Sequence, residues 1–309
     1  MNKTRRNSLL LILAAFIWGT CFVAQSAGGD VIGPYSFNGI RMLIGGLFLL
    51  PVIALFTKTG HSPRAPKTRE DRRTLLRGGI LTGIFLFFAS NLQQIGINLG
   101  SSVGKAAFLT DCYIFLVPML GIFLGKKCPK RILACVAVAL VGLYLLCITD
   151  SLTLQTSDIL LILCAFVFAA QILSIDHYTS ILDGLRLACF EFFVCGILTL
   201  IPMFFYEILP AGGFLAWART IRGLTVWGSL LYAGIFSCGI AYSIQAIAQD
   251  EVNPTVASLI MSLESVFSTL FGWILLKEHL TGRELLGCFI IFIAVILAQL
   301  PGRNKTEEA

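Results

Sequence analysis

Long runs of apolar residues, separated by short polar segments, follow one another along almost the entire chain. A helix needs about 20 mostly apolar residues to cross a hydrocarbon core of roughly 30 Å. By this measure the sequence predicts ten transmembrane helices, at approximately residues 9–27, 35–56, 78–98, 105–124, 132–149, 158–176, 187–206, 226–247, 255–276 and 285–301. We therefore expect an all-α integral membrane protein.

The composition excludes the main alternatives. Of the 309 residues, 57% are hydrophobic and only 13% are charged, and the mean hydropathy is +0.85. A soluble domain carries about 25% charged residues, and a disordered chain has low hydrophobicity and high net charge. The apolar runs are also continuous, whereas the strands of a membrane barrel alternate over short segments.

The basic residues indicate topology rather than a nucleic-acid partner. The net charge is +6, but Lys and Arg gather in short segments between apolar runs, above all in residues 58–77 and 126–131. If the N-terminus is inside, 17 Lys and Arg lie on the inner side and 5 on the outer side, as the positive-inside rule requires. We therefore expect a multi-pass protein of the cell membrane with both termini cytoplasmic. The basic, apolar start resembles a signal peptide, but we expect it to be retained because it belongs to an internal repeat.

That repeat becomes visible when the chain is shifted by about 150 residues. Residues 10–16 overlie residues 160–166 with six of seven positions identical. At a shift of 151, a polar stripe in the third span (Asn91, Gln94, Asn98) overlies one in the eighth (Tyr242, Gln245, Gln249). Each copy, at 9–149 and 158–301, contains five spans. Because five is odd, the second copy enters the membrane from the opposite side, and inverted repeats are typical of secondary transporters.

Four charged residues lie inside predicted spans, where a charge costs roughly 2.5–3.5 kcal/mol on insertion scales. Arg41 and Glu191 are 150 residues apart, so they occupy equivalent positions with opposite charge. We interpret both as structural, paired with each other or with other groups, or reaching toward the interface. Asp111 and Glu264 lie in the fourth and ninth spans. Burial favours the protonated carboxyl group, so these two can carry protons. The alternatives are that they bind a substrate amine or form hydrogen bonds between helices.

Weaker polar and aromatic residues form stripes on several spans. Trp18 shares a helix face with Cys21 or Phe22 and with Gln25, and Phe168 shares one with Gln171. Because an unsatisfied amide is costly in lipid, these faces either bond between helices or line an aqueous path. The path is favoured, and the candidate substrate-binding residues are Trp18, Asn91, Gln94, Tyr113, Gln171, Tyr242 and Gln245.

No motif for catalysis, cofactor binding or metal binding is visible. The segment Gly100–Lys105 resembles a P-loop, but the spacing is one residue short and Ala106 replaces the Ser or Thr that holds magnesium. No GxSxG or HExxH pattern occurs, and most of the ten cysteines lie inside apolar runs. We therefore expect a protein that is not an enzyme, with no cofactor, no metal and no catalytic residue.

Several motifs resemble those of the EamA-type permeases of the drug/metabolite transporter superfamily. They are Trp18-Gly19 in the first span, Arg41 after Pro34 in the second, Ala106-Ala107-Phe108-Leu109-Thr110 with Tyr113, Val117-Pro118 and Gly125-Lys126-Lys127 in the fourth, and Ala257-Ser258-Leu259, Leu263-Glu264, Gly272-Trp273 and Lys277-Glu278-His279-Leu280-Thr281 in the ninth. The resemblance covers nearly the whole chain, as two EamA units. The chain departs from the family pattern at Ser265, where the family usually has Pro after Glu264, and at Lys277, where Gly is usual.

The resemblance implies ten helices around a central cavity, walled mainly by the first, third, fourth, sixth, eighth and ninth spans. Members of the family move amino acids, other metabolites and drugs, and many are driven by protons. We therefore predict a secondary transporter that moves a small organic metabolite or drug, with an amino-acid-like solute favoured. It would work by alternating access, coupled to protons, as a monomer or weak homodimer in the bilayer. The alternative is a non-transporting membrane sensor or scaffold that retains the fold.

Overall fold

The computed structural model describes residues 3–59, 64–126, 128–147, 155–249, 252–277 and 281–299, which form helices and no strand. Ten helical rods occupy the positions of the ten predicted spans, so the all-helical prediction is confirmed. Parts of three sequence features lie outside the described residues, namely Lys127, the motif residues Glu278–Leu280, and the predicted ends of both repeats at 148–149 and 300–301.

The first repeat runs from α1 to α6. Its rods are α1 (Lys3–Ile32), α2 (Pro34–Lys58), α3 (Arg69–Asn98), a broken fourth rod made of α4 (Val103–Asp111) and α5 (Tyr113–Phe123), and α6 (Lys130–Cys147). Helix starts follow local sequence signals. Thr68 and Asp71 form a reciprocal capping box at α3, which satisfies backbone N–H groups that have no helical partner.

The second repeat has the same order of rods. These are α7 (Thr156–Thr179), α8 (Gly184–Met203) continued by the π-turn η1 (Phe204–Ile208), a rod of α10 (Leu224–Leu231), the π-helix η2 (Tyr232–Tyr242) and α11 (Ser243–Ala248), a broken rod of α12 (Pro254–Met261) and α13 (Leu263–Leu276), and α14 (Gly282–Gln299). A short helix, α9 (Phe214–Thr220), was not predicted because it carries no long apolar run.

Among the described residues, eight rods are long and apolar enough to cross a membrane. The other two, α6 and α14, take the places of the fifth and tenth predicted spans, and each is described over only 18 residues. Large apolar side chains such as Leu47, Ile197 and Phe289 are exposed on the outer faces of the rods. Lipid covers such faces in a membrane, whereas a soluble monomer rarely exposes so much apolar surface.

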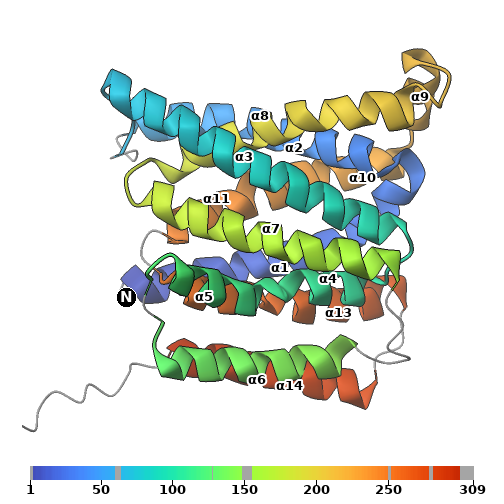
Figure 1. The fold of residues 1–309 in the computed structure, drawn as a ribbon. Helices are drawn as coiled ribbons and strands as arrows, with labels where there is room; N and C mark the ends of the chain where they lie inside the picture. The colour runs from blue at the N-terminus through green and yellow to red at the C-terminus, as the bar shows by residue number, and fades with distance from the viewer. Residues whose placement is uncertain are drawn as a thin grey trace, which may run out of the picture.

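Equivalent helices of the two repeats make equivalent contacts across the molecule. Helix α6 packs along α14 and α2 packs along α8, each joining a rod to its own counterpart. Helix α3 packs on α7, and its counterpart η2 packs on α1. The pair α6 and α14 lies along one edge of the bundle (Figure 1). This arrangement leaves α1, α3, α4–α5, α7, η2–α11 and α12–α13 around the centre.

The closest approach of α1 to α13 depends on Gly19. A Cβ atom at this position would lie 2.8 Å from the carbonyl oxygen of Glu264 and 2.9 Å from the backbone nitrogen of Ser268. Backbone atoms cannot move aside as a flexible side chain can, so only glycine fits here. This contact joins the two repeats beside the break between α12 and α13, and it gives a physical reason for the glycine of the Trp18-Gly19 motif.

We predict that Gly19→Ala will destabilise the protein by about 1–3 kcal/mol, the usual cost of overpacking a tight contact. Thermal unfolding of the purified protein in detergent should show a lower melting temperature. The matched control is Gly228→Ala, because nothing lies within 4 Å of a Cβ atom built there. Equal melting temperatures for the two variants would contradict this account of the α1–α13 contact.

Candidate functional site

A cavity lies between the two repeats, with about 450 Å³ of unfilled space that includes space open to solvent. Both repeats contribute to its wall. The lining side chains are Trp18, Phe22 and Gln25 of α1, Arg41 of α2, Gln93 of α3, Thr110 of α4, Tyr113 of α5, Phe168, Gln171 and Ile172 of α7, Ser237 and Tyr242 of η2, Gln245 of α11, Met261 of α12 and Glu264 of α13.

Corresponding helices of the two repeats line the same cavity with side chains of different chemical character. Trp18 and Phe168 are 150 residues apart, and both are aromatic wall residues on the first rod of their repeat. Tyr113 of the fourth rod and Glu264 of the ninth are one residue out of register at this shift, and one half supplies a phenol to the wall while the other supplies a carboxyl group. The wall is therefore symmetric in position and asymmetric in charge.

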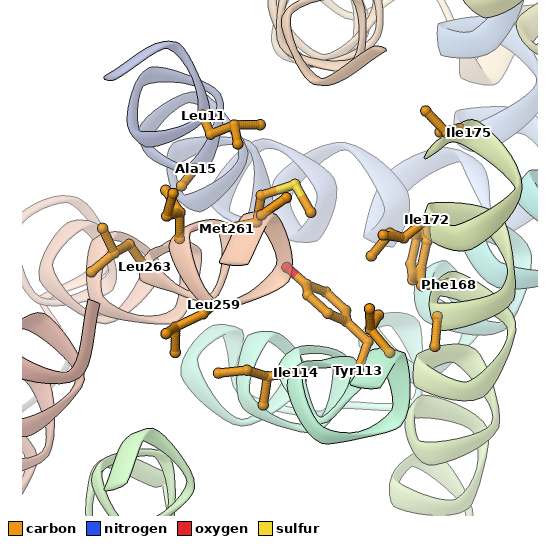
Figure 2. Packing of buried hydrophobic residues seen from close by; sticks show 14 of the residues in the cluster. Leu11, Ala15, Tyr113, Ile114, Phe168, Ile172, Ile175, Leu259, Met261 and Leu263 are labelled. Atoms are coloured by element: carbon orange, nitrogen blue, oxygen red, sulfur yellow. The ribbon is translucent and has the colours of Figure 1, made fainter. Parts of the chain in front are cut away.

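Aromatic rings shape the middle of the cavity. The Trp18 and Tyr242 rings meet edge to face with centroids 4.9 Å apart, and Phe192 supports Tyr242 from behind at 5.6 Å. Figure 2 shows Tyr113 reaching from its helix toward Met261, with Phe168 and Ile172 of α7 beside it. These packed rings fix the shape of the site, because each is held by its neighbours.

Three polar atoms of wall residues are buried without a hydrogen-bond partner in the described part of the chain. They are the indole nitrogen Nε1 of Trp18 and the amide oxygens Oε1 of Gln25 and Gln245. An unpaired buried polar group costs about 1–3 kcal/mol, so native structures rarely leave one unused. One donor and two acceptors on side chains of the cavity wall suit a polar solute that supplies the matching groups.

Two carboxyl groups meet at the edge of the cavity. Glu264 lines the wall, and Asp111, which is fully buried, lies behind it. The two carboxyl groups lie close enough to interact electrostatically, and the Ser265 hydroxyl donates a hydrogen bond to Asp111 Oδ2.

Both carboxyl groups stand beside breaks in the helices. The fourth rod breaks at Cys112 and the ninth at Ser262, exactly equivalent residues 150 apart. At each break a backbone hydrogen bond joins residues three apart instead of four. The Phe115 N–H donates to the Cys112 carbonyl and the Ser265 N–H donates to the Ser262 carbonyl, both at 3.3 Å. Discontinuous helices near the midplane are a recurring feature of transporter sites.

The ninth rod breaks without the proline that the family pattern usually places after Glu264. The hydroxyls of Ser258, Ser262 and Ser268 instead donate to backbone carbonyls three residues earlier, at 2.8–3.0 Å. Serine side chains that bond to the backbone in this way compete with helical hydrogen bonds and bend helices. The serines therefore weaken the ninth rod, as Pro118 inside α5 weakens the fourth.

Not all residues predicted to bind substrate reach the cavity. Trp18, Tyr113, Gln171, Tyr242 and Gln245 line it, whereas Asn91 and Gln94 do not. The Asn91 amide donates to Thr199 Oγ1 at 3.0 Å and to the Phe87 carbonyl at 2.8 Å. The Gln94 amide donates to the Gln25 carbonyl at 3.1 Å and to Asn98 Oδ1 at 2.9 Å. These two amides therefore bond within and between helices, which was the alternative interpretation of the stripes.

The sequence pattern missed several wall residues. Gln93, rather than its neighbour Gln94, faces the cavity from α3, and the other unexpected residues are Thr110, Ile172, Ser237 and Met261. Phe22, Gln25 and Phe168 share helix faces with predicted residues, and that spacing was the signal for them. Gln93 and Gln94 are adjacent, so they point in different directions from the helix. The apolar stripe of a helix that borders lipid on one side and protein on the other does not determine which of the two faces the cavity.

The two charges interpreted as structural do not pair with each other. Glu191 accepts a hydrogen bond from the Gln171 amide. Arg41 Nε donates to Asn38 Oδ1 at 3.0 Å, and its guanidinium lies 5.8 Å from the centre of the Phe37 ring. Arg41 is also part of the cavity wall, so its position is not only structural. Within the described residues no group of three or more His, Cys, Asp or Glu could hold a metal ion.

Comparisons with known proteins agree with the arrangement of two five-helix units. The sequence profile of the EamA-like transporter family matches residues 6–148 and again residues 155–300. The chain belongs to the EamA-like transporter family. It is 29% identical over 291 residues to an uncharacterized transporter of Archaeoglobus fulgidus, a match that covers 94% of this chain and 84% of the relative.

Two further relatives of this EamA protein have more specific names. It is 25% identical to a probable amino-acid metabolite efflux pump of Escherichia coli, with 95% of each chain covered. It is 24% identical to an S-adenosylmethionine/S-adenosylhomocysteine transporter of Chlamydia muridarum, covering 92% of this chain and 90% of the relative. A solved crystal structure shares the fold with a TM-score of 0.73 over 96% of both chains, at 16% identity.

The Gln171–Glu191 contact predicts a non-additive effect on stability. Gln171→Leu removes the donor and leaves the buried Glu191 carboxyl group without it, which should cost about 1–3 kcal/mol. The double variant Gln171→Leu/Glu191→Leu removes both polar partners, and it should unfold closer to the wild-type temperature than the single variant. Thermal unfolding in detergent measures both. The single variant Glu191→Leu completes the comparison. If the double variant lowers the melting temperature by as much as the two single variants together, or by more, this coupling is contradicted.

Proposed function

We propose that this protein is a secondary transporter that moves a small organic metabolite, with an amino-acid-like solute favoured, across the cell membrane by alternating access. The observation that carries the proposal is the polar cavity between two inverted repeats, lined by Trp18, Tyr242, Gln245 and Glu264. A transporter needs a solute site near the midplane that the two halves of the protein share. A sensor or scaffold has no need of orphaned polar atoms in that position.

The chemistry of the wall supports an amino-acid-like solute. A cationic Arg41 and the Asp111–Glu264 acid pair supply both signs of charge, and the amides of Gln25 and Gln245 add neutral polar contacts. The named relatives handle amino-acid metabolites and S-adenosyl compounds, and S-adenosylmethionine itself contains an amino-acid group. Aromatic rings beside the polar atoms provide surface for an apolar side chain.

Ionic contacts at both ends of the bundle provide the parts of a gate. Lys105 pairs with Asp158 at 2.8 Å where α4 and α7 begin, and Lys126 pairs with Asp176 where α5 and α7 end. Both pairs join one repeat to the other. Rocking of the repeats about the central cavity would open one end while the contacts at the other end hold.

At the Lys105 end a third contact ties the repeats together. The Glu207 carboxylate of η1 accepts hydrogen bonds from the backbone N–H groups of Tyr35 and Ser36, at 2.8 Å and 2.6 Å. These are free N–H groups at the start of α2, where a negative charge is favourable. The counts of Lys and Arg support an orientation with this end outside and both chain termini in the cytoplasm.

Protons are the proposed coupling ion, and the Asp111–Glu264 pair is the proposed carrier. Two neighbouring buried carboxyl groups favour sharing one proton, because both cannot readily ionise side by side, and Glu264 lines the cavity. A solute amine that binds Glu264 would displace that proton, which links solute binding on one side to proton release.

Proteoliposomes loaded with labelled L-amino acids test this proposal. With a pH gradient across the membrane, the wild type should move solute at a rate that changes with the gradient. Asp111→Asn and Glu264→Gln should reduce the gradient-driven flux to near that of empty liposomes, because neither side chain can then release a proton. Solute exchange without a gradient should survive better than driven flux.

The matched control is Glu70→Gln, which neutralises an exposed carboxyl group at the start of α3. It should leave both flux and pH dependence unchanged. Unchanged pH dependence in both Asp111→Asn and Glu264→Gln would overturn proton coupling by this pair. Wild-type liposomes that move none of the solutes would overturn the transporter proposal itself.

A further inference from the structure

Arg41 carries a buried positive charge that no carboxylate of the described chain balances. The side chain is only 3% exposed and forms part of the cavity wall. Among the described residues, the ion pairs to Asp are formed by Lys105, Lys126 and Arg186. Arg41 forms none within this part of the chain. A buried cation is costly unless something pairs with it, so its place in the wall requires an explanation.

The groups around Arg41 do not supply that partner. Its Nε atom is used by Asn38, a neutral amide, and its guanidinium lies over the Phe37 ring. The Cys21 thiol lies within electrostatic range of Arg41, and thiols are neutral near pH 7. Glu191 accepts a hydrogen bond from Gln171, and among the described residues neither Glu191 nor Glu264 forms an ion pair with Arg41.

Arg41 and Glu264 mark two poles of one cavity. Both line it, and both lie within electrostatic range of Tyr242, yet they do not pair with each other. A cation and an acid held apart on the walls of one cavity match a solute with opposite charges at its two ends. The Tyr242 and Trp18 rings, which line the same cavity, would contact the body of such a solute.

We propose that Arg41 binds the carboxylate of the transported solute and so selects solutes that carry one. This inference rests on the proposed transport function and names the chemical class of its substrate. The outer nitrogens of a guanidinium form a planar fork that matches the two oxygens of a carboxylate, and the Nε atom is the one that Asn38 already uses. A single cation balances the single charge of a carboxylate, whereas a phosphate ester would bring a second, unbalanced charge.

The wild-type protein provides the first test. Purified protein in detergent is titrated with a panel of L-amino acids, each matched by its carboxamide and by the amine that lacks the carboxyl group. Binding is measured by thermal shift and by isothermal titration calorimetry. We expect at least one acid to bind, and its amide and amine to bind about 30-fold more weakly or worse, as loss of one partner of a buried charge pair entails.

Variants of Arg41 provide the second test. Arg41→Met should lose the preference for the acid over its amide, because it removes the charge, while Arg41→Lys should retain part of it. The matched control is Arg77→Gln, an exposed position outside the cavity, which should keep the wild-type preference. Gel filtration of each variant checks folding, and the wild-type comparison of acid with amide does not depend on any variant.

The outcomes separate this inference from the function on which it rests. If the wild type binds or transports amides and amines as well as acids, the assignment of Arg41 is wrong and the transporter proposal stands. If Arg41→Met folds and keeps the preference for acids, the assignment is also wrong. A wild type that neither binds nor moves any solute of the panel contradicts both.

Discussion

The cost of a polar group in a medium without water governs this structure. Inside the bilayer each amide, acid and guanidinium must find a partner in the protein or face a polar space. Asn91, Gln94 and Glu191 find partners on neighbouring helices. Trp18, Gln25 and Gln245 do not, and all three face one cavity between the repeats. The cavity wall therefore gathers three unpaired polar atoms from both repeats.

The inverted repeat explains why that cavity lies at the centre. Equivalent rods pack across the molecule, and the fourth and ninth rods break at equivalent residues, Cys112 and Ser262. Two broken rods that face each other bring Asp111 and Glu264 together from opposite halves. The repeats differ in chemistry, and positions one residue out of register supply Tyr113 on one side and Glu264 on the other. Symmetry thus sets the position of the site, and divergence sets its charge.

The fold could be predicted from the sequence in most respects, because span length and apolar runs depend on the bilayer alone. The positions of all ten rods, the absence of strands among the described residues and the EamA resemblance follow from such signals. The wall was less predictable. Gln93 and Gln94 differ by one step of helix rotation, which depends on packing against α7 and α8. Arg41 was interpreted as structural because sequence cannot show which buried charges find partners. The short α9 lacks the apolar run on which the prediction depended.

The most direct test of a polar cavity between the repeats compares two neighbouring positions of α11. Gln245 is 2% exposed and lines the cavity, while Ile247 is 42% exposed on the outer surface. Each is replaced by Cys, membranes are treated with a charged, membrane-impermeant thiol reagent, and modification at the new Cys alone is read by mass spectrometry. Water in the cavity predicts modification at 245 and none at 247, which faces lipid. Modification at 247 but not at 245 would contradict a solute path through the centre.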